Sequence, residues 1–363
     1  MARERLALFE FMPQPGGGQR VCALIAQTLA GDYDVHLLSP EPATRSWWET
    51  TFDVDLRNVT IGTTDRTRTL GRRSTRVNVL PDRYDVLINA EYAYWALDPT
   101  RARTRLIMAH DAHPLDRTPS YLADYHCAIA CSEYGRGKLE DEQWPIAKAV
   151  LYPPIFENDP MGPPAATPRT EQGIILTVAR FDHHRHNNSL PSVVAAFQTA
   201  YDAGLRDYEL VIAGFVQDTA LYEQLAASAR GYPIRFVASP TRPELRALYR
   251  RAAFLLNVRG IDSALPTTAF SHEALGVVTI EAISHGCLPI VHGCAGHLET
   301  VPDPNLHIES LASLPQRLTE IVRRHETPAV REAAWRPLFE AARTRFSATT
   351  YVRNFKRLVE RLR

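Results

Sequence analysis

Short apolar runs alternate with longer amphipathic stretches along most of the chain. In the first half, the apolar runs predict strands at residues 6–12, 34–39, 77–80, 85–90, 105–110 and 127–132. Between the first two runs, the apolar positions of residues 20–30 have helical spacing. This alternation is typical of a parallel sheet flanked by helices. We therefore expect a doubly wound α/β unit in the first half.

The pattern restarts after a proline-rich, aperiodic stretch at residues 151–170, which is typical of a connector. Strands are predicted at residues 173–181, 208–215, 233–239, 253–258 and 287–293, with helices at 190–203, 220–230, 242–251 and 278–285. The last stretch, from about residue 328, has helical spacing. We expect one α/β domain at 1–155, a second at 171–335, and C-terminal helices at 336–363 that pack back on the first domain.

Composition narrows the functional classes. Hydrophobic residues make up 45% of the 363 residues and charged residues 23%, which excludes disorder as the main state. The 41 basic residues equal the 41 acidic ones, so there is no net positive charge to attract nucleic acid or an anionic membrane. Only Lys138, Lys148 and Lys356 are lysines, so arginine is the expected partner of any bound anion.

The sequence contains few signals for membrane targeting, secretion or cysteine-based metal and redox sites. No apolar run approaches the length of about 18 to 20 residues that a membrane span requires, and the N-terminal apolar stretch is too short for a signal peptide. A cytoplasmic protein without a transmembrane segment is therefore expected. The five cysteines form no C-x-x-C pair and are interpreted as small core residues.

A glycine run at 16–18 lies between the first predicted strand and helix. Backbone N–H groups at such a junction can hold an anion. The run is neither G-x-G-x-x-G nor a P-loop, so a dinucleotide site and an NTPase are not supported. A tight turn without a ligand is an equally good interpretation of these residues alone.

Residues 271–301 contain a more specific pattern, in which Glu273 and Glu281 flank Gly276 at a predicted helix start. The first carboxylate precedes the helix and the second lies on it, so both can face one site. The amides from Leu275 to Val278 are then positioned for a phosphate, while carboxylates suit sugar hydroxyls. The alternative is that both acids only stabilise the helix dipole.

This segment resembles the E-x7-E region of the retaining glycosyltransferases of family 4, which have the GT-B architecture of two Rossmann-like domains facing across a cleft. Further similarity lies in GGGQR, RLIMAHD, CSEYGRG followed by LYPPIF, and LTVARFDHHRHNN, so it extends over most of the chain. The resemblance implies an acceptor-side first domain and a donor-binding second domain.

The resemblance also implies roles for individual residues. Glu273 would contact the transferred sugar, Arg180 the diphosphate and His110 the donor sugar, and these three are the candidate catalytic residues. The candidate donor-binding residues are Gly17, Gly18, Arg180, Arg185, Leu275, Gly276, Val277 and Glu281, with Glu281 on the ribose. His110 has a second interpretation as a strand-end histidine, and Arg180 as the partner of Asp182.

Two departures from the family pattern stand out. The family usually has a second diphosphate-binding lysine five or eight residues after the arginine, where this chain has Arg185 and Asn188. A second cation is retained only if Arg185 takes that role. The approach to the motif, residues 259–270, is also longer than usual, which suits an acceptor-side loop or a surface insertion.

No metal site is expected. Asp53 and Asp55 form a D-x-D that is interpreted as exposed strand carboxylates, and His183, His184 and His186 lack spaced cysteine or acidic partners. The resemblance likewise implies no metal and no cofactor, since the nucleoside diphosphate sugar is a substrate.

The sequence thus predicts a retaining glycosyltransferase that transfers a sugar from a nucleoside diphosphate donor to the hydroxyl of a small soluble molecule or glycan. The alternatives are a nucleotide-sugar epimerase on the same fold and a non-catalytic sugar-nucleotide-binding partner. A pyridoxal-dependent phosphorylase is disfavoured because the second domain has no suitable lysine. The nucleotide base, the sugar, the acceptor and the oligomeric state are not specified by the sequence.

Overall fold

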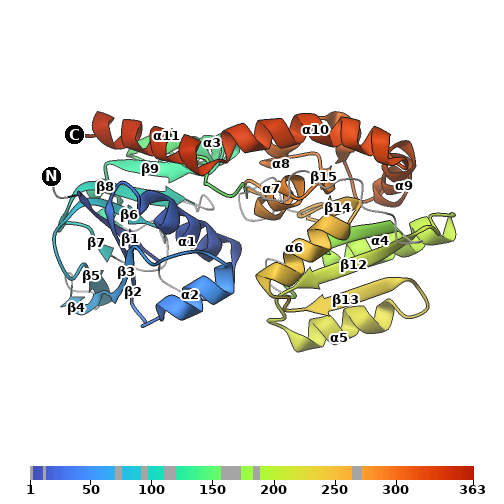
Figure 1. Cartoon of the computed structure of the whole chain (residues 1–363), viewed down its shortest axis with the longest axis horizontal. Coiled ribbons are helices and arrows are strands. Elements are labelled where there is room, and N and C mark those ends of the chain that lie inside the picture. Colours follow the sequence, from blue (N-terminus) through green and yellow to red (C-terminus); the bar gives the residue numbers. More distant parts are fainter. Residues whose placement is uncertain are drawn as a thin grey trace. The chain divides into compact units, whose positions relative to one another are not determined.

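The chain divides into two compact units in the computed structural model (Figure 1). The first comprises Met1–Ile155 and Phe346–Arg363, and the second comprises Phe156–Arg345. The structure describes residues 3–10, 14–69, 76–90, 97–109, 120–156, 173–182, 189–263 and 272–363.

The first unit is built on a seven-stranded parallel sheet with the order β10-β9-β8-β6-β1-β2-β3. Its strands are β1 (Arg5–Phe9), β2 (Asp34–Ser39), β3 (Val59–Thr63), β6 (Tyr84–Asn89), β8 (Ala102–Ala109), β9 (Cys127–Ala130) and β10 (Ala147–Val150). The central strand β1 pairs with β2 on one side and β6 on the other, so Leu6 lies between Val35 and Val86. Residues Leu6 to Phe9 are fully buried, as expected for a parallel strand covered on both faces.

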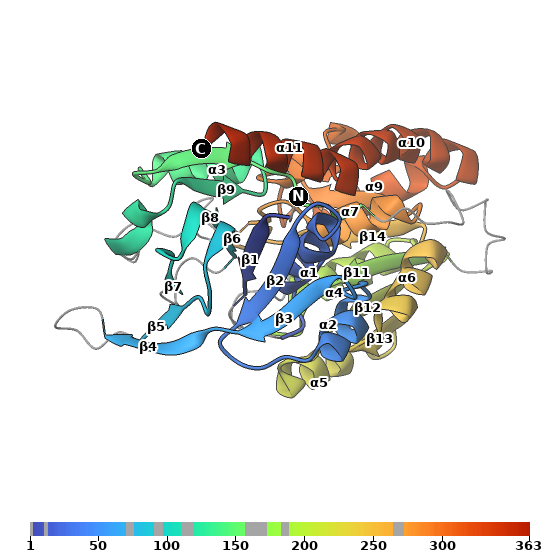
Figure 2. The same cartoon turned by 60° about the vertical axis from the view of Figure 1, so that its left-hand side comes forward.

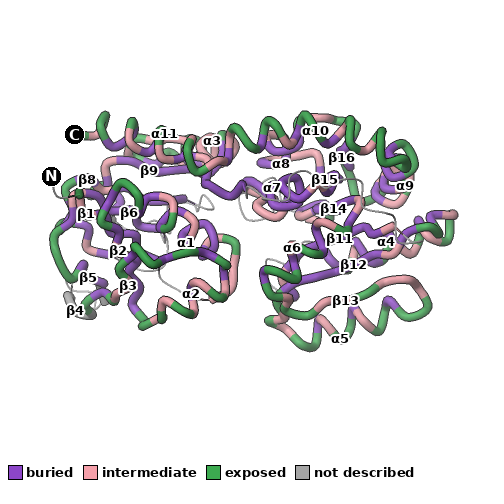
Figure 3. The backbone as a smooth tube through the Cα atoms, in the orientation of Figure 1, coloured by how far each residue is buried: buried purple, intermediate pink, exposed green. Residues whose placement is uncertain are grey.

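Three further strands of the first unit form a small mixed sheet with the order β4-β5-β7. They are β4 (Asp65–Thr69), β5 (Arg76–Val79) and β7 (Leu97–Asp98). The helices of this unit are α1 (Gly17–Leu29), α2 (Arg45–Phe52), α3 (Glu133–Asp141), the short η2 (Ser120–Asp124) and α11 (Ala348–Arg361). In both units the central strands are buried, whereas the edge strands β3, β10 and β13 are partly exposed and the helices expose their outer faces (Figure 3).

The second unit contains a six-stranded parallel sheet with the order β13-β12-β11-β14-β15-β16. Its strands are β11 (Gly173–Val178), β12 (Tyr208–Gly214), β13 (Ile234–Ala238), β14 (Phe254–Asn257), β15 (Leu288–His292) and β16 (His307–Ile308). The chain runs outward from β11 through β12 and β13, then returns to the other side of β11 as β14. The order therefore reverses between β11 and β14, which is where ligands bind in open parallel sheets.

Helices flank this sheet and complete its core. They are α4 (Leu190–Asp202), α5 (Thr219–Ser228), α6 (Arg242–Arg251), α7 (Val277–Ser284), α8 (His297–Thr300), η3 (Pro304–Leu306), α9 (Leu314–Arg324) and α10 (Pro328–Arg345). One core cluster packs Leu245, Leu248 and Tyr249 of α6 on Leu176 and Leu255 of the sheet. Helix α6 begins with a capping box between Thr241 and Glu244, which fixes its first turn.

The two C-terminal helices belong to different units. Helix α10 stays with the second unit, where the indole Nε1 of Trp335 donates to the Ile283 carbonyl at 2.8 Å. Helix α11 packs in the first unit, where Phe355 is fully buried and its ring lies 5.7 Å from that of Tyr33. Figure 2 shows α11 beside α1 and α3. The sequence placed the return to the first unit at residue 336, whereas the units divide at residue 345 because the whole of α10 packs on the second.

The predicted fold class is confirmed, since both halves are Rossmann-like α/β units with parallel sheets. One local expectation was wrong. Asp53 and Asp55 do not lie on a strand, because α2 ends at Phe52 and Asp53 follows it in the left-handed conformation, with φ of 53°. Among the described residues, no helix has the length and apolarity needed to cross a membrane.

Candidate functional site

Two arginines follow neighbouring strands at the point where the order of the second sheet reverses. Arg180 lies two residues beyond β11, and Arg259 lies two residues beyond β14. Carboxyl ends of adjacent parallel strands lie at one edge, so the two guanidinium groups are brought together there. Burial lowers the pKa of Arg180; the carboxylate of Asp182 opposes this effect, and the charge of Arg259 adds to it. Two half-buried cations that repel each other are an arrangement suited to an anion.

The end of β11 is fixed by packing. Phe181 is fully buried, pairs with Val216 as an isolated bridge, and lies against the rings of Tyr222 and Phe236. Because side chains alternate along extended backbone, Arg180 and Asp182 point to the side opposite Phe181. The Arg180 guanidinium donates to Gln217 Oε1 at 3.4 Å.

The turn at residues 273–276 places a carboxylate beside Arg259. Glu273 Oε1 accepts the Gly276 N–H at 3.2 Å, and Glu273 Oε2 lies 3.9 Å from Arg259 Nη1. Burial would raise the pKa of Glu273, but the charge of Arg259 and the N–H groups of Gly276 and Leu275 hold that pKa below its ordinary value. Glu273 is therefore an anion at neutral pH.

Helix α7 starts directly after this turn. Gly276 is its N-cap and has φ of 91°, a left-handed conformation that glycine adopts without strain. The first N–H groups of any helix have no acceptor within it. The N–H groups of Leu275 and Gly276, just before the helix, face the Glu273 carboxylate. Among the residues predicted to bind the donor substrate, Val277 is therefore the first whose N–H belongs to the open start of α7.

A second glycine holds the adjacent loop against this turn. The Gly296 N–H donates to the Glu273 carbonyl at 2.9 Å. A Cβ at Gly296 would lie 2.1 Å from the Ala274 oxygen, so no other residue fits without moving the turn. This close approach brings the His297 ring onto the turn, where its Cδ2 would lie 3.2 Å from a Cβ placed at Gly276.

His297 is a fully buried histidine with a free ring nitrogen. Its Nδ1 lies 3.1 Å from the His292 carbonyl, which can only accept, so Nδ1 carries the proton. Its Nε2 is buried and has no hydrogen-bond partner among the described residues. Burial lowers the pKa of His297 to about 4, so the ring is neutral and Nε2 presents a lone pair near Glu273.

Glu281 lies elsewhere in the unit. Its side chain is only 2% exposed, and its Oε1 lies 3.0 Å from Arg242 Nη2 of α6. Its Oε2 accepts from Arg242 Nη1 at 3.3 Å and from the Tyr249 hydroxyl at 3.0 Å. Most of the accepting capacity of this carboxylate is therefore used in joining α7 to α6.

The structure thus brings Arg180, Glu273, Leu275, Gly276 and Val277 into one region of the second unit, while the Glu281 carboxylate is bound to α6. Sequence reasoning missed Arg259 and His297. The sequence signal for Arg259 is its position just after a predicted strand. The signal for His297 is the glycine that precedes it, Gly296, in the loop after β15. His110, Arg185 and Asn188 lie outside the described residues.

The glycine loop belongs to the first unit, at the carboxyl end of β1. Helix α1 begins at Gly17, and its N-cap Gly16 has no side-chain hydrogen bond. Among the described residues, a Cβ at Gly17 would meet no atom within 4 Å. Two buried polar groups lie nearby, since Gln19 Nε2 donates to Glu10 Oε1 at 3.0 Å.

The structure describes one of the two groups that the sequence raised as metal candidates. Asp55 is exposed and lies 2.7 Å from Arg57 Nε. The Arg57 side chain accordingly lowers the pKa of Asp55. The histidines at 183, 184 and 186 lie outside the described residues.

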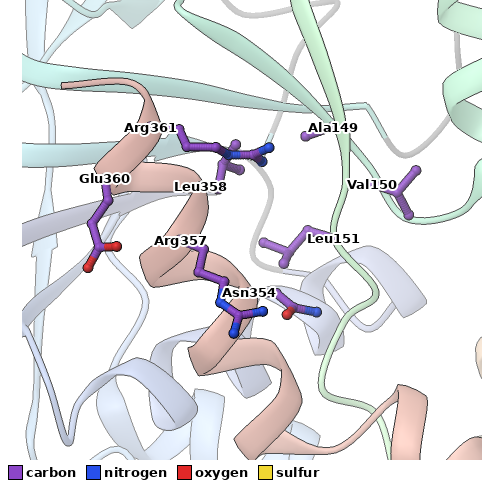
Figure 4. Close-up of a pocket in the computed structure, with 8 residues that line it drawn as sticks. All are labelled: Ala149, Val150, Leu151, Asn354, Arg357, Leu358, Glu360 and Arg361. Carbon is purple, nitrogen blue, oxygen red and sulfur yellow. The ribbon is translucent and has the colours of Figure 1, made fainter.

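A surface cavity of about 500 Å³ lies in the first unit between β10 and α11 (Figure 4). Its charged lining comes from Arg357, Glu360 and Arg361, and Arg357 lies beside Asn354 in the view. It contains none of the predicted site residues. Both arginines are exposed, as is typical of the solvated face of an amphipathic helix.

Comparison with known proteins supports a glycosyltransferase fold. No protein-family model matches the chain. A curated relative, the GDP-mannose:cellobiosyl-diphosphopolyprenol alpha-mannosyltransferase of Komagataeibacter xylinus, is 34% identical over 131 residues. That match covers 35% of this chain and 29% of the relative.

Solved structures match over nearly the whole length. Anabaena HepE, in complex with UDP and glucose, has a TM-score of 0.69 at 12% identity, covering 99% of this chain and 100% of HepE. A TarM mutant of S. aureus, in complex with UDP and two further ligands, has a TM-score of 0.71 at 7% identity, covering 98% and 99%. At these identities the likeness establishes the GT-B fold.

We predict that His297 makes unfolding stability depend on pH. Its pKa is about 4 in the folded protein and about 6.5 when unfolded, so the unfolded chain binds the proton more readily. The contribution of about 3 kcal/mol is complete above pH 6.5 and is lost as the pH falls to 4. Denaturant unfolding of His297→Gln should show a smaller loss over this interval.

The matched control is Leu298→Gln, a change at the neighbouring residue, whose side chain is 50% exposed. It should retain the pH dependence of the unsubstituted protein. An unchanged pH dependence in His297→Gln would show that this ring does not titrate as the burial implies.

We predict that Glu281→Ala destabilises the fold by about 3 to 5 kcal/mol, because it leaves the Arg242 guanidinium buried without its carboxylate. Glu320→Ala, which removes an exposed partner of Arg317, is the control and should have little effect on stability.

Nucleotide affinity measured on the same variants tests whether Glu281 binds the ribose. A fall of about 1 to 3 kcal/mol supports it, and unchanged affinity excludes it.

Proposed function

We propose that the chain is a retaining glycosyltransferase of the family 4 type, which transfers a sugar from a nucleoside diphosphate donor to an acceptor hydroxyl. The observation that carries the proposal is the convergence of Arg180, Arg259 and the start of α7 at the reversal point of the second sheet. Two guanidinium groups and free helix amides are a matching set of donors for a diphosphate.

The donor sugar is assigned to the turn at residues 273–276. Sugar hydroxyls donate hydrogen bonds, and the Glu273 carboxylate, as an anion, accepts them there. Its burial strengthens the discrimination, because a donor lacking the hydroxyl would leave a buried carboxylate oxygen without that partner.

The chemistry follows from the same charges. As the bond between sugar and diphosphate breaks, negative charge grows on the leaving oxygen, and fixed cations with helix amides stabilise it. No side chain is assigned as a covalent nucleophile. In the front-face displacement that the family resemblance implies, the leaving diphosphate takes the acceptor proton. Retention of configuration is part of this proposal.

The second diphosphate cation has two candidates. The spacing of the sequence suggests Arg185, whereas the described geometry offers Arg259, which lies in electrostatic range of Arg180 and has only 14% of its side chain exposed. Arg259 is also 3.9 Å from Glu273, so it can bridge the sugar and phosphate parts of the donor. We favour Arg259 because a buried cation loses less to solvent screening.

Donor turnover with and without an acceptor tests the function. The mannosyltransferase relative is named for GDP-mannose, and HepE was solved with UDP. GDP-mannose and UDP-glucose are therefore the first donors to assay, after a thermal-shift comparison of GDP, UDP, dTDP and ADP. We expect a nucleotide to raise the unfolding temperature and release of nucleoside diphosphate to depend on acceptor. Acceptor-independent isomerisation indicates an epimerase, and binding without turnover indicates a non-catalytic partner.

Replacing the arginines should separate the two candidates. Arg180→Ala and Arg259→Ala are each expected to lower kcat by about a hundredfold, close to 3 kcal/mol of lost transition-state stabilisation. Arg185→Ala is the matched comparison and should keep kcat within about threefold of the unsubstituted enzyme on this assignment. A large loss in Arg185→Ala with little loss in Arg259→Ala would return the role to Arg185. Asn188→Lys tests the remaining position, since a donor affinity raised by this change would place the family lysine there.

Transfer should persist in EDTA, because arginines and helix amides, rather than a divalent cation, are assigned to the diphosphate. The measurement is the initial rate before and after chelation, with Mg²⁺ or Mn²⁺ added back. Activity lost to the chelator and restored by either of these ions would contradict the assignment.

A further inference from the structure

Three metal-ligating side chains gather beside the proposed donor site. They are His272, His292 and Cys294, and each has a ligand atom within 4.8 Å of those of the other two. Both histidines are buried, with 5% and 8% of their surface exposed, and Cys294 is partly buried. None of the three is assigned to the diphosphate or to the sugar.

The backbone holds the three residues from two directions. His292 is the last residue of β15, and Cys294 follows in a tight turn whose N–H donates to the His292 carbonyl at 2.7 Å. His272 precedes Glu273, whose carbonyl accepts the Gly296 N–H. The segment that carries His272 is thus joined to the loop that carries Cys294 by a backbone hydrogen bond, which limits the reorganisation that a bound ion would require.

The distances approach those of a tetrahedral metal site. Zn²⁺ binds histidine nitrogen at about 2.0 Å and thiolate sulfur at about 2.3 Å, so neighbouring ligand atoms lie about 3.3 to 3.6 Å apart. Cys294 Sγ lies 3.3 Å from His292 Nδ1. The same nitrogen lies 3.3 Å from the Arg259 carbonyl, so an ion bound at Nδ1 would replace the proton that this nitrogen shares with that carbonyl. The widest separation must close by about 1 Å, which rotation of the side chains can supply.

The ligand set and the local charge favour one class of ion. Imidazole with thiolate suits Zn²⁺ and similar borderline-soft dications, whereas Mg²⁺ and Ca²⁺ require oxygen ligands. The Glu273 carboxylate lies in electrostatic range of Cys294 and adds negative charge beside the cluster.

We propose that His272, His292 and Cys294 form a binding site for a Zn²⁺-class dication, which fastens the Glu273 turn to the end of β15. The ion stabilises the folded second unit and has no assigned part in sugar transfer. The proposal is therefore independent of the proposed function, and retention of activity in EDTA is compatible with it.

Cobalt binding provides the test, because Co²⁺ bound to thiolate has an intense near-ultraviolet charge-transfer band that imidazole or carboxylate sites lack. Reduced, metal-free protein should develop this band with one equivalent of Co²⁺ and lose it when Zn²⁺ displaces the cobalt. Zn²⁺ should also raise the unfolding temperature, since an ion that binds only the folded state stabilises it.

Substitutions identify which side chains bind the ion. Cys294→Ser should abolish the band and weaken Zn²⁺ binding at least about 100-fold. His272→Gln, which keeps the thiol, should weaken binding independently. The controls are Cys131→Ser in the first unit and the combined change of His183, His184 and His186 to Gln. Both controls should bind cobalt as the unsubstituted protein does. Circular dichroism confirms that each variant is folded.

The proposal is overturned if the unsubstituted protein shows no thiolate band, or if the band persists in folded Cys294→Ser. Loss of the band in the histidine-triple variant would likewise overturn it by placing the ion elsewhere. Because no readout uses turnover, an inactive protein that binds cobalt through Cys294 would count against the glycosyltransferase proposal alone.

Discussion

The close contact between Gly296 and the turn at residues 273–276 is the constraint on which the candidate site depends. The absence of a side chain at Gly296 lets two loops of the second unit meet backbone to backbone, with the Gly296 N–H on the Glu273 carbonyl. That contact orients Glu273 toward Arg259 and buries His297 on Gly276. The sheet supplies the position of the site, and this contact supplies its detailed geometry.

In the proposed function, electrostatics give the site its selectivity for an anion with hydroxyl groups. The chain as a whole has no net charge, so attraction of a nucleotide cannot come from the overall field. It has to come from local groups, and Arg180 and Arg259 are placed where adjacent strands end. Each is partly removed from water, which strengthens its interaction with a phosphate. The same burial keeps the neighbouring His297 neutral.

Much of the fold was predictable because alternating apolar runs specify parallel strands with little help from distant residues. The strand at residues 34–39 and helix α6 lie where the pattern placed them, and the strand predicted at 127–132 is β9, which ends at Ala130. Asp53 was placed on a strand because a few alternating apolar residues fit the end of a short amphipathic helix as well as a strand. The left-handed conformation of Asp53, directly after Phe52, shows that α2 ends there.

The site was predictable in part for a related reason. A family motif indicates Glu273, Gly276 and Arg180 directly, although their roles in donor binding stay predictions. The position of Arg259 after a predicted strand is a local signal, but its proximity to Arg180 could not be found from local sequence, because β11 and β14 become neighbours only when the chain returns across the sheet. The partner of Glu281 was hidden in the same way, since Arg242 lies 39 residues earlier on a different helix.

A crystal structure with a bound nucleoside diphosphate tests the central claim most directly. The account predicts that the diphosphate lies between the guanidinium groups of Arg180 and Arg259, at the start of α7. A nucleotide bound with its phosphates away from both arginines, for example only at the glycine loop before α1, would contradict it.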